Sequence, residues 1–123
     1  MRQSCIYGPR QFGVEDQGWV AWFAIAASLG KDITIFGDGK QIRDVLHVDE
    51  LVRAYLAAIS KQEQVSGQAF NLGGGLENTL SLLELLTMLE QSLGRKIEPT
   101  WSDWRPGDQR VFVCDLHKAR EQL

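Results

Sequence analysis

Residues 33–48 read Ile33-Thr-Ile-Phe-Gly-Asp-Gly-Lys-Gln-Ile-Arg-Asp-Val-Leu-His-Val48. The β-branched run Ile33–Phe36 predicts a short strand, and Ile42–Val48 alternates enough between apolar and polar residues to predict a second one. Gly37-Asp-Gly39 lies between them and predicts a turn, because glycine supplies the positive φ that tight turns need. The stretch is therefore expected to form a strand, a turn and a strand.

Helices are expected on both sides of this stretch. The spacing of apolar residues predicts four of them, over Trp19–Leu29, Leu51–Ile59, Leu82–Leu89 and Leu116–Leu123. Asp49 is the expected N-cap of the second helix, and Ser81 with Glu84 forms a capping box at the start of the third. Gly30 and Gly94 are expected to end the first and third helices, since glycine readily adopts the left-handed conformation of a C-cap.

Further short strands are expected between these helices. They lie at Arg2–Tyr7, Ala69–Leu72, Ile97–Trp101 and Val111–Val113. Gly8-Pro9 ends the first of them, because proline cannot donate a hydrogen bond to a neighbouring strand. Strands and helices alternate with short connections, so the expected fold class is α/β, with short strands and about four helices.

The composition limits the classes of protein that fit. The chain has 123 residues, of which 44% are hydrophobic and 24% charged, and its net charge is −3. It can bury a core and is too hydrophobic to be disordered, so one domain or a piece of a larger domain is expected. Asp and Glu (16) outnumber Lys and Arg (13), which argues against nucleic-acid binding. The longest apolar stretch, Trp19–Leu29, is shorter than the roughly 20 residues that a bilayer requires, and no apolar run follows a basic start. Neither a membrane span nor a signal peptide is therefore expected.

Two cysteines, Cys5 and Cys114, lie far apart in the sequence, and neither belongs to a Cys-x-x-Cys pair. Together with two scattered histidines they offer too few soft ligands for a metal site, so no metal is expected. The simplest interpretation is that both are reduced thiols in a cytoplasmic protein.

The familiar enzyme motifs are incomplete or missing. Gly37 and Gly39 are followed by Ile42 where a dinucleotide fingerprint needs its third glycine, and Gly73–Gly75 is explained more simply as a tight turn. Lys40 lacks the upstream glycine of a phosphate-binding loop, and there is no Gly-x-Ser-x-Gly nucleophile motif. Neither tyrosine is followed by a lysine four residues later, so no catalytic residue is assigned.

Three polar clusters lie in predicted loops and strand ends, at Tyr7–Gln11, Gly37–Asp44 and Arg105–Arg110. Each places an arginine close to glycine or proline. The planar guanidinium suits phosphate oxygens, glycine lets a ligand approach the backbone, and a neighbouring aspartate can accept from ribose hydroxyls. Any one cluster alone is explained as well by a surface salt bridge. The three together favour a polyanionic small ligand such as a nucleotide.

The chain resembles the NAD-dependent nucleotide-sugar epimerases and dehydratases, which are extended short-chain dehydrogenases. The resemblance covers essentially the whole chain and rests on strings that occur in the family's order: Tyr7-Gly-Pro-Arg10, Gly37-Asp-Gly-Lys-Gln-Ile-Arg-Asp44 followed by Val48-Asp49, Phe70-Asn-Leu-Gly-Gly74, and Arg105-Pro-Gly-Asp108. The resemblance implies the C-terminal, substrate-binding part of such an enzyme. Residues 1–123 would form a single substrate-binding lobe, and the NAD-binding domain is absent from the sequence.

Within this family the chain is most similar to the CDP-tyvelose (CDP-paratose) 2-epimerases. The similar strings are Arg10-Gln-Phe12, Asp16-Gln-Gly-Trp19 and Asp108-Gln-Arg-Val-Phe-Val113. The family often has asparagine where this chain has Cys5, whereas a small Cys or Ser fits this branch better. No sugar contact is therefore carried over to Cys5.

The resemblance also implies roles for individual residues. Arg43 would bind a phosphate, Arg105 the diphosphate and Asp108 the ribose. Gln11 and Trp19 are candidates for the sugar or the base. For Trp19 a purely structural role, filling the core with its aromatic neighbours, is the favoured alternative.

The cofactor of the intact family is NAD. The resemblance implies that the backbone of Tyr7, Gly8 and Pro9 touches its nicotinamide end. No NAD is expected to be bound by this chain alone, because it lacks the glycine fingerprint and the Tyr-x-x-x-Lys motif. In the intact family a tyrosinate takes a proton from a sugar hydroxyl, hydride passes to NAD⁺, and it returns to the other face of the sugar. This chain would supply substrate binding and no catalytic base.

The expected partner is a nucleotide sugar, with CDP favoured, and neither nucleic acid nor membrane. Arg2–Tyr7 and Ala69–Leu72 would belong to a large parallel sheet whose other strands are missing, so self-association is predicted. One alternative is a stand-alone or split-enzyme binding module with no catalysis of its own. A remnant that binds no ligand is a further alternative.

Overall fold

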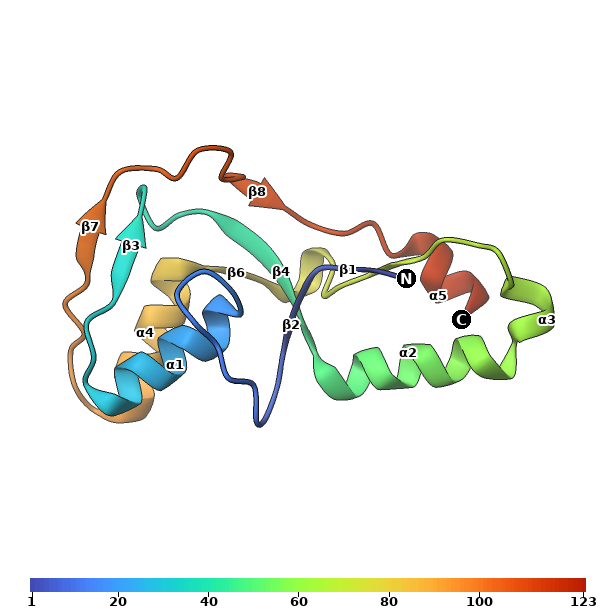
Figure 1. The fold of residues 1–123 in the computed structure, drawn as a ribbon, viewed down its shortest axis with the longest axis horizontal. Coiled ribbons are helices and arrows are strands. Elements are labelled where there is room, and N and C mark those ends of the chain that lie inside the picture. Colours follow the sequence, from blue (N-terminus) through green and yellow to red (C-terminus); the bar gives the residue numbers. More distant parts are fainter. The chain divides into compact units, whose positions relative to one another are not determined.

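The computed structural model describes residues 1–123, which divide into two compact units. Unit 1 comprises Met1–Pro9, Arg43–Thr79 and Val113–Leu123, and unit 2 comprises Arg10–Ile42 and Leu80–Phe112. Each unit combines helices with short parallel strands, so the predicted α/β class is confirmed (Figure 1). No helix is both long and apolar enough to span a membrane.

Unit 1 is built from strands near the N-terminus and helices from the middle and end of the chain. Its strands are β1 (Arg2–Gln3), β2 (Cys5–Tyr7), β4 (Ile42–His47, apart from its first residue) and β5 (Asn71–Leu72). Its helices are α2 (Val48–Ser60), α3 (Gln62–Val65), a 3₁₀ turn at Leu76–Asn78 and α5 (His117–Gln122).

The first predicted strand changes partner in its middle. β1 pairs in parallel with β5, placing Arg2 opposite Asn71, and β2 pairs in parallel with β4, placing Cys5 opposite Val45. Ser4 lies between β1 and β2 in the chain, and its backbone N–H donates to the carbonyl of Leu72 in β5 at 2.8 Å. The segments Arg2–Tyr7 and Ala69–Leu72 were expected to lack partner strands, but their strands β1 and β5 pair with each other.

The core of unit 1 covers only part of helix α2. The buried residues are Val65, Phe70, Leu72 and Ala119, and α2 contributes Leu51, Ala54 and Ala58 at its edge. A second apolar set on α2 recurs at helical spacing but stays 40–64% exposed: Val52, Tyr55, Leu56 and Ile59. We call this set the outer stripe of α2. A helix that is apolar on two sides normally has neighbours on both.

Unit 2 pairs two helices with two parallel strands. Its main elements are α1 (Trp19–Leu29), β3 (Thr34–Phe36), α4 (Leu82–Leu93), β7 (Thr100–Ser102) and β8 (Val111–Phe112). β6 (Thr79–Ser81) crosses the boundary between the units. α1 packs against α4, and the core consists of Phe23, Ala26, Ala27, Ile33, Ile35, Leu85 and Leu86. The apolar run of α1 is thus explained by burial, as its sequence predicted.

The helix ends follow the local chemistry of the sequence. Gly30 has a φ of 65° at the end of α1, and the Ser81–Glu84 capping box starts α4, so both predictions are confirmed. The predicted N-cap Asp49 is wrong. α2 begins one residue earlier, and His47 is its N-cap, with Nδ1 accepting from the Asp49 N–H at 3.3 Å. Asp49 instead lies in the first turn, where its charge suits the positive end of the helix dipole.

The remaining differences concern short elements. α3 was not predicted because its four polar-rich residues carry no periodic signal, and β6 was not predicted either. The strand expected at Ile97–Trp101 begins later, at Thr100. Short elements of this kind are fixed by their neighbours rather than by local propensity.

Candidate functional site

Arg105, in the loop between β7 and β8, is the most heavily engaged arginine of unit 2. Its guanidinium lies 3.8 Å from the centre of the Phe36 ring at the end of β3. Its two terminal nitrogens face carboxylates, one from Glu15 at 3.7 Å and one from Asp16 at 3.1 Å. Stacking on an aromatic ring orients the planar guanidinium and leaves its edge available to anions.

The two carboxylates stand at the tip of a tight hairpin. Val14 and Gln17 exchange both backbone hydrogen bonds, at 2.9 and 3.0 Å, so Glu15 and Asp16 form its two-residue tip. The base of the hairpin is fixed against α1: a β-carbon at Gly13 would lie 2.4 Å from a backbone nitrogen of that helix. Only glycine fits there, and the close approach determines where the tip lies.

The loop that follows Arg105 is a turn of known type. Arg105-Pro-Gly-Asp108 closes with a 3.1 Å hydrogen bond from the Asp108 N–H to the Arg105 carbonyl, and Gly107 has a φ of 78°. Proline followed by glycine with positive φ is the signature of a type II turn. The two residues that the sequence proposed for diphosphate and ribose are thus held at the two ends of one turn.

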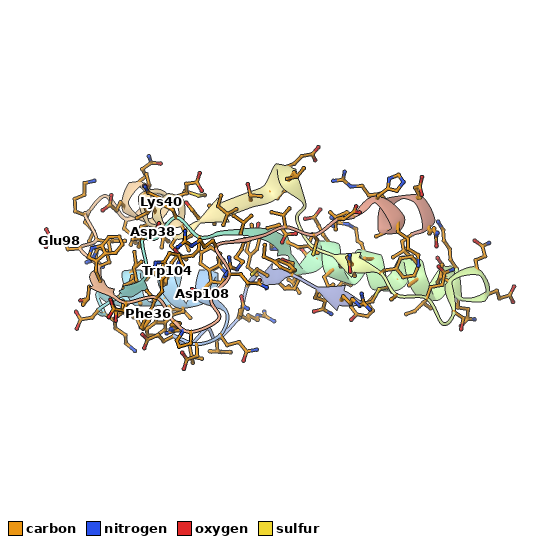
Figure 2. The ribbon with its side chains drawn as sticks, turned by 90° about the horizontal axis from the view of Figure 1, so that it is seen from above. Phe36, Asp38, Lys40, Glu98, Trp104 and Asp108 are labelled. Atoms are coloured by element: carbon orange, nitrogen blue, oxygen red, sulfur yellow. The ribbon has the colours of Figure 1, made fainter.

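The glycine-rich turn after β3 lies under an aromatic ring. The ring of Trp104 packs on Gly37, whose φ is 82°. The Asp38 carboxylate accepts from the Lys40 N–H at 3.0 Å, and the Arg110 guanidinium lies 5.4 Å from the Trp104 ring centre. Figure 2 shows Asp38 and Lys40 near Trp104 in this part of the unit. The predicted turn is confirmed, and its shape depends on the tryptophan as well as on its glycines.

One edge of β3 remains open. The parallel pairing with β7 uses the backbone groups of every second residue of this segment. One of these bonds runs from the Gly37 N–H to the Ser102 carbonyl at 2.9 Å. By this alternation the backbone groups of Thr34 and Phe36 face the opposite edge. There the Phe36 carbonyl accepts from the side-chain amide of buried Gln41 at 2.8 Å. An open strand edge offers donors and acceptors that can pair with a planar nucleobase. Sequence reasoning missed this edge, because it depends on which side β7 takes.

The other two candidate residues of unit 2 are Trp19 and Gln11. Trp19, the first residue of α1, packs edge-on against Phe23 with ring centres 6.2 Å apart, and it borders the core. This arrangement supports the structural alternative for Trp19. Gln11 lies in the loop before the hairpin and is half-buried, with its amide nitrogen 3.1 Å from a β-carbon built at Gly18.

Unit 1 contains the residues proposed for the cofactor. Tyr7 ends β2, and its ring meets His47 edge-on with centres 5.4 Å apart. A β-carbon at Gly8 would lie 2.5 Å from the Val48 side chain, so glycine is required there by close packing. Pro9 follows as an exposed residue. The backbone at Gly8 is therefore constrained by its own neighbours.

Arg43 and Asp44 lie next to each other on β4, so their side chains point to opposite faces. Asp44 is fully buried, and its carboxylate accepts from the Ser4 hydroxyl and from the backbone N–H groups of Gly75 at 3.1 Å and Cys114 at 3.2 Å. Three donors compensate the burial of this charge. Asp44 thereby fixes the strand that carries Arg43.

The thiol of Cys114 lies beside this buried carboxylate. Burial, and then the negative charge of Asp44, raise the pKa of the Cys114 thiol. Both cysteines are free thiols in the structure. A raised pKa keeps Cys114 protonated near neutrality and lowers its reactivity.

Comparison with known proteins identifies the family. Residues 1–73 match the model of the NAD dependent epimerase/dehydratase family. The CDP-paratose 2-epimerase of Salmonella typhi is 44% identical over 127 residues, covering 99% of this chain and 38% of that protein. The UDP-glucose 4-epimerase of Mycolicibacterium smegmatis is 39% identical over 118 residues, covering 96% of this chain and 36% of that protein.

Solved structures agree with this result. The UDP-glucose 4-epimerase of Thermotoga maritima with UDP-glucose superposes with a TM-score of 0.82 at 35% identity, covering 98% of this chain and 37% of that chain. The UDP-glucuronic acid 4-epimerase of Bacillus cereus in complex with UDP-glucuronic acid and NAD gives 0.79 at 33% identity, covering 99% and 37%. The chain thus spans less than two fifths of the length of the relatives it matches. It belongs to the NAD dependent epimerase/dehydratase family, as the resemblance of its motifs predicted.

Proposed function

We propose that this chain is the nucleotide-sugar-binding part of a sugar-nucleotide epimerase. The observation that carries the proposal is the type II turn that holds Arg105 and Asp108 together, with the Arg105 guanidinium stacked on Phe36 at the end of an open strand edge. The guanidinium donors suit a diphosphate, the carboxylate suits a ribose, and the β3 edge that no other strand covers suits a base.

The residue roles follow from this arrangement. Arg105 binds the diphosphate and Asp108 the ribose hydroxyls, while the base lies along the Thr34–Phe36 edge of β3. Arg43, on the strand that Asp44 anchors, binds a phosphate in unit 1. Gln11 contacts the sugar or the base, and Trp19 contributes there mainly by shaping the start of α1.

NAD is the cofactor of the family, and its nicotinamide accepts and returns a hydride when it is bound. In this chain the backbone of Tyr7, Gly8 and Pro9 is the only segment that we assign to it. Gly8 is closely packed against Val48, so this segment offers the cofactor a fixed stretch of backbone and not an enclosing loop. We propose that this segment alone does not hold NAD, and that the chain has no catalytic base of its own.

Within the family we favour a CDP-sugar 2-epimerase. The support is the 44% identity to a relative named CDP-paratose 2-epimerase. A stand-alone or split-enzyme binding module is the alternative. Adding the NAD-binding part of a relative separates a stand-alone binding module from the other interpretations, because only the binding part of an epimerase or one half of a split enzyme would then gain epimerase activity.

We also propose that the chain self-associates through unit 1 and works in the cytoplasm. The outer stripe of α2 is the surface that supports self-association. The two free cysteines are consistent with a reducing compartment.

Calorimetric titration with CDP, UDP and dTDP tests the proposed function. We expect CDP to bind, and Arg105→Ala and Arg43→Ala each to weaken binding at least tenfold, because a lost charge-assisted phosphate contact costs about 1.5–3 kcal/mol. Arg53→Ala is the matched control, since Arg53 is an exposed arginine of α2 whose only recorded ion pair is with Glu50. If a folded chain gives no heat with any of the three nucleotides, the proposal is wrong.

A further inference from the structure

The Arg105 guanidinium is already surrounded by anions. The Glu15 carboxylate faces one terminal nitrogen and the Asp16 carboxylate faces the other, while Phe36 covers one face of the plane. Asp16 is 87% exposed at its side chain and Glu15 48%, whereas Arg105 is 36% exposed. The carboxylates thus reach inward from solvent to a cation that is mostly covered.

A diphosphate at Arg105 would compete with these carboxylates. The guanidinium has a limited fork of donors, and its two terminal nitrogens each face one carboxylate. Like charges held within a few ångströms of each other repel, so two carboxylates and a diphosphate do not share one guanidinium without a penalty. Binding of the nucleotide therefore favours departure of the hairpin tip.

We infer that the Glu15–Asp16 hairpin is an anionic strap, which occupies the Arg105 guanidinium in the free protein and is displaced when a nucleoside diphosphate binds. The inference rests on the proposed function, because it assumes that Arg105 receives the diphosphate. The strap is suited to this exchange: Gly13 packs its base against α1, while exposed ion pairs of modest strength hold its tip. The tip can then move without disturbing α1.

The strap also stands next to another candidate residue. Gln11, proposed for the sugar or base, precedes the hairpin, whereas Trp19 is the first residue of α1 and stays in place when the tip moves. Nucleotide affinity would thus be set partly by residues that do not contact the bound nucleotide.

The first test measures nucleotide affinity in the full chain. Glu15→Gln with Asp16→Asn removes the competing charges and keeps the side-chain sizes. We expect the Kd for CDP to fall about threefold to tenfold, the range for loss of one or two partly exposed ion pairs. Glu63→Gln with Glu98→Gln is the matched control: it changes net charge equally, at exposed positions outside the hairpin. Figure 2 shows Glu98 well away from Asp108. Equal Kd values in the wild type and the strap variant, or an equal gain in the control, would overturn the strap while leaving the proposed function intact.

The second test needs no ligand. Amide hydrogen exchange at Val14 and Gln17 reports the hairpin directly, because these two amides make its hydrogen bonds. We expect exchange to quicken severalfold in the strap variant and in Arg105→Ala, and to stay unchanged in the control. Saturating CDP should have the same effect on the wild type. Unchanged exchange in both variants means that the ion pairs do not hold the hairpin, and the inference then fails. If no form binds nucleotide, the proposed function fails, and so does the displacement step; the exchange data then show only whether the ion pairs hold the tip.

Discussion

The ring of Trp104 lies on the α-carbon of Gly37, so closely that a β-carbon at position 37 would be 2.5 Å from the ring. We predict that Gly37→Ala destabilises the protein by about 2–4 kcal/mol, because it combines a positive φ with a displaced tryptophan. Chemical denaturation measures the change. Gly94→Ala is the control, since Gly94 has a φ of 65° but nothing within 4 Å. Equal losses in the two variants would mean that the tryptophan contact adds nothing.

The buried Asp44 carboxylate gives a second prediction. We expect Asp44→Ala to lower the free energy of unfolding by about 2–4 kcal/mol, because it leaves the buried N–H of Gly75 and the partly buried N–H of Cys114 without an acceptor. Asp44→Asn should retain part of this stability, since its oxygen can accept both bonds while its amide donates to Ser4. Urea unfolding distinguishes the two. An alanine variant as stable as the asparagine variant would show that the carboxylate does not hold these segments together.

The sequence predicted the long elements better than the short ones. The apolar run of α1 and the Ser81–Glu84 box are strong local signals, and the structure confirms both. The N-cap of α2 was misplaced because His47, which is not a common capping residue, takes the position that Asp49 was expected to fill.

The candidate site was only partly visible in the sequence. Motifs indicated Arg105 and Asp108, and the type II turn explains why those residues recur with proline and glycine between them. The open edge of β3 and the contact between Arg105 and the Glu15–Asp16 tip depend on residues roughly 60 to 90 positions apart. Such contacts leave no local pattern in a single sequence.

The capping box predicts a pH dependence of stability. The hydrogen bonds from the Ser81 hydroxyl and backbone N–H lower the pKa of Glu84 below its ordinary value of 4.5. A lowered folded-state pKa contributes stability that is complete above the unfolded value and is lost as the pH falls through the folded value. We therefore expect the stability difference between the wild type and Glu84→Gln to be constant above about pH 5.5 and to shrink below about pH 4.5. Thermal unfolding from pH 3 to 7 measures it, and a difference that does not vary with pH would contradict the prediction.

The raised pKa of Cys114 predicts slow alkylation. Because the thiolate is the reactive species, we expect Cys114 in the native chain to react with iodoacetamide more slowly than the same thiol in urea, and the ratio of the urea rate to the native rate to shrink as the pH rises through the pKa of the unfolded thiol. Mass spectrometry of the Cys5→Ser variant follows Cys114 alone. Asp44→Asn should speed the reaction, because it removes the neighbouring negative charge. Equal rates in native and unfolded chains would show that the site does not perturb the thiol.

The proposed self-association is tested at the outer stripe of α2. We expect Leu56→Glu, at a position that is 60% exposed, to shift sedimentation velocity profiles toward the monomer without lowering stability by more than about 0.5 kcal/mol. Leu76→Glu is the control, since Leu76 is 83% exposed and lies outside α2. A wild-type chain that remains monomeric at high concentration would contradict self-association itself.

The carboxylate of Asp44 has a consequence for biosynthesis. Its three partners lie 40, 31 and 70 residues away along the chain. A nascent polypeptide presents residue 44 well before it presents residue 114, so unit 1 cannot complete these hydrogen bonds until residue 114 has been synthesised. Contacts of such long range also make folding slow, because the chain loses the entropy of the closed loops before the contacts form. Until residue 114 has been synthesised, the Asp44 carboxylate is hydrated rather than bonded to all of its partners, and the strand edges of unit 1 stay open to chaperones and to proteolysis.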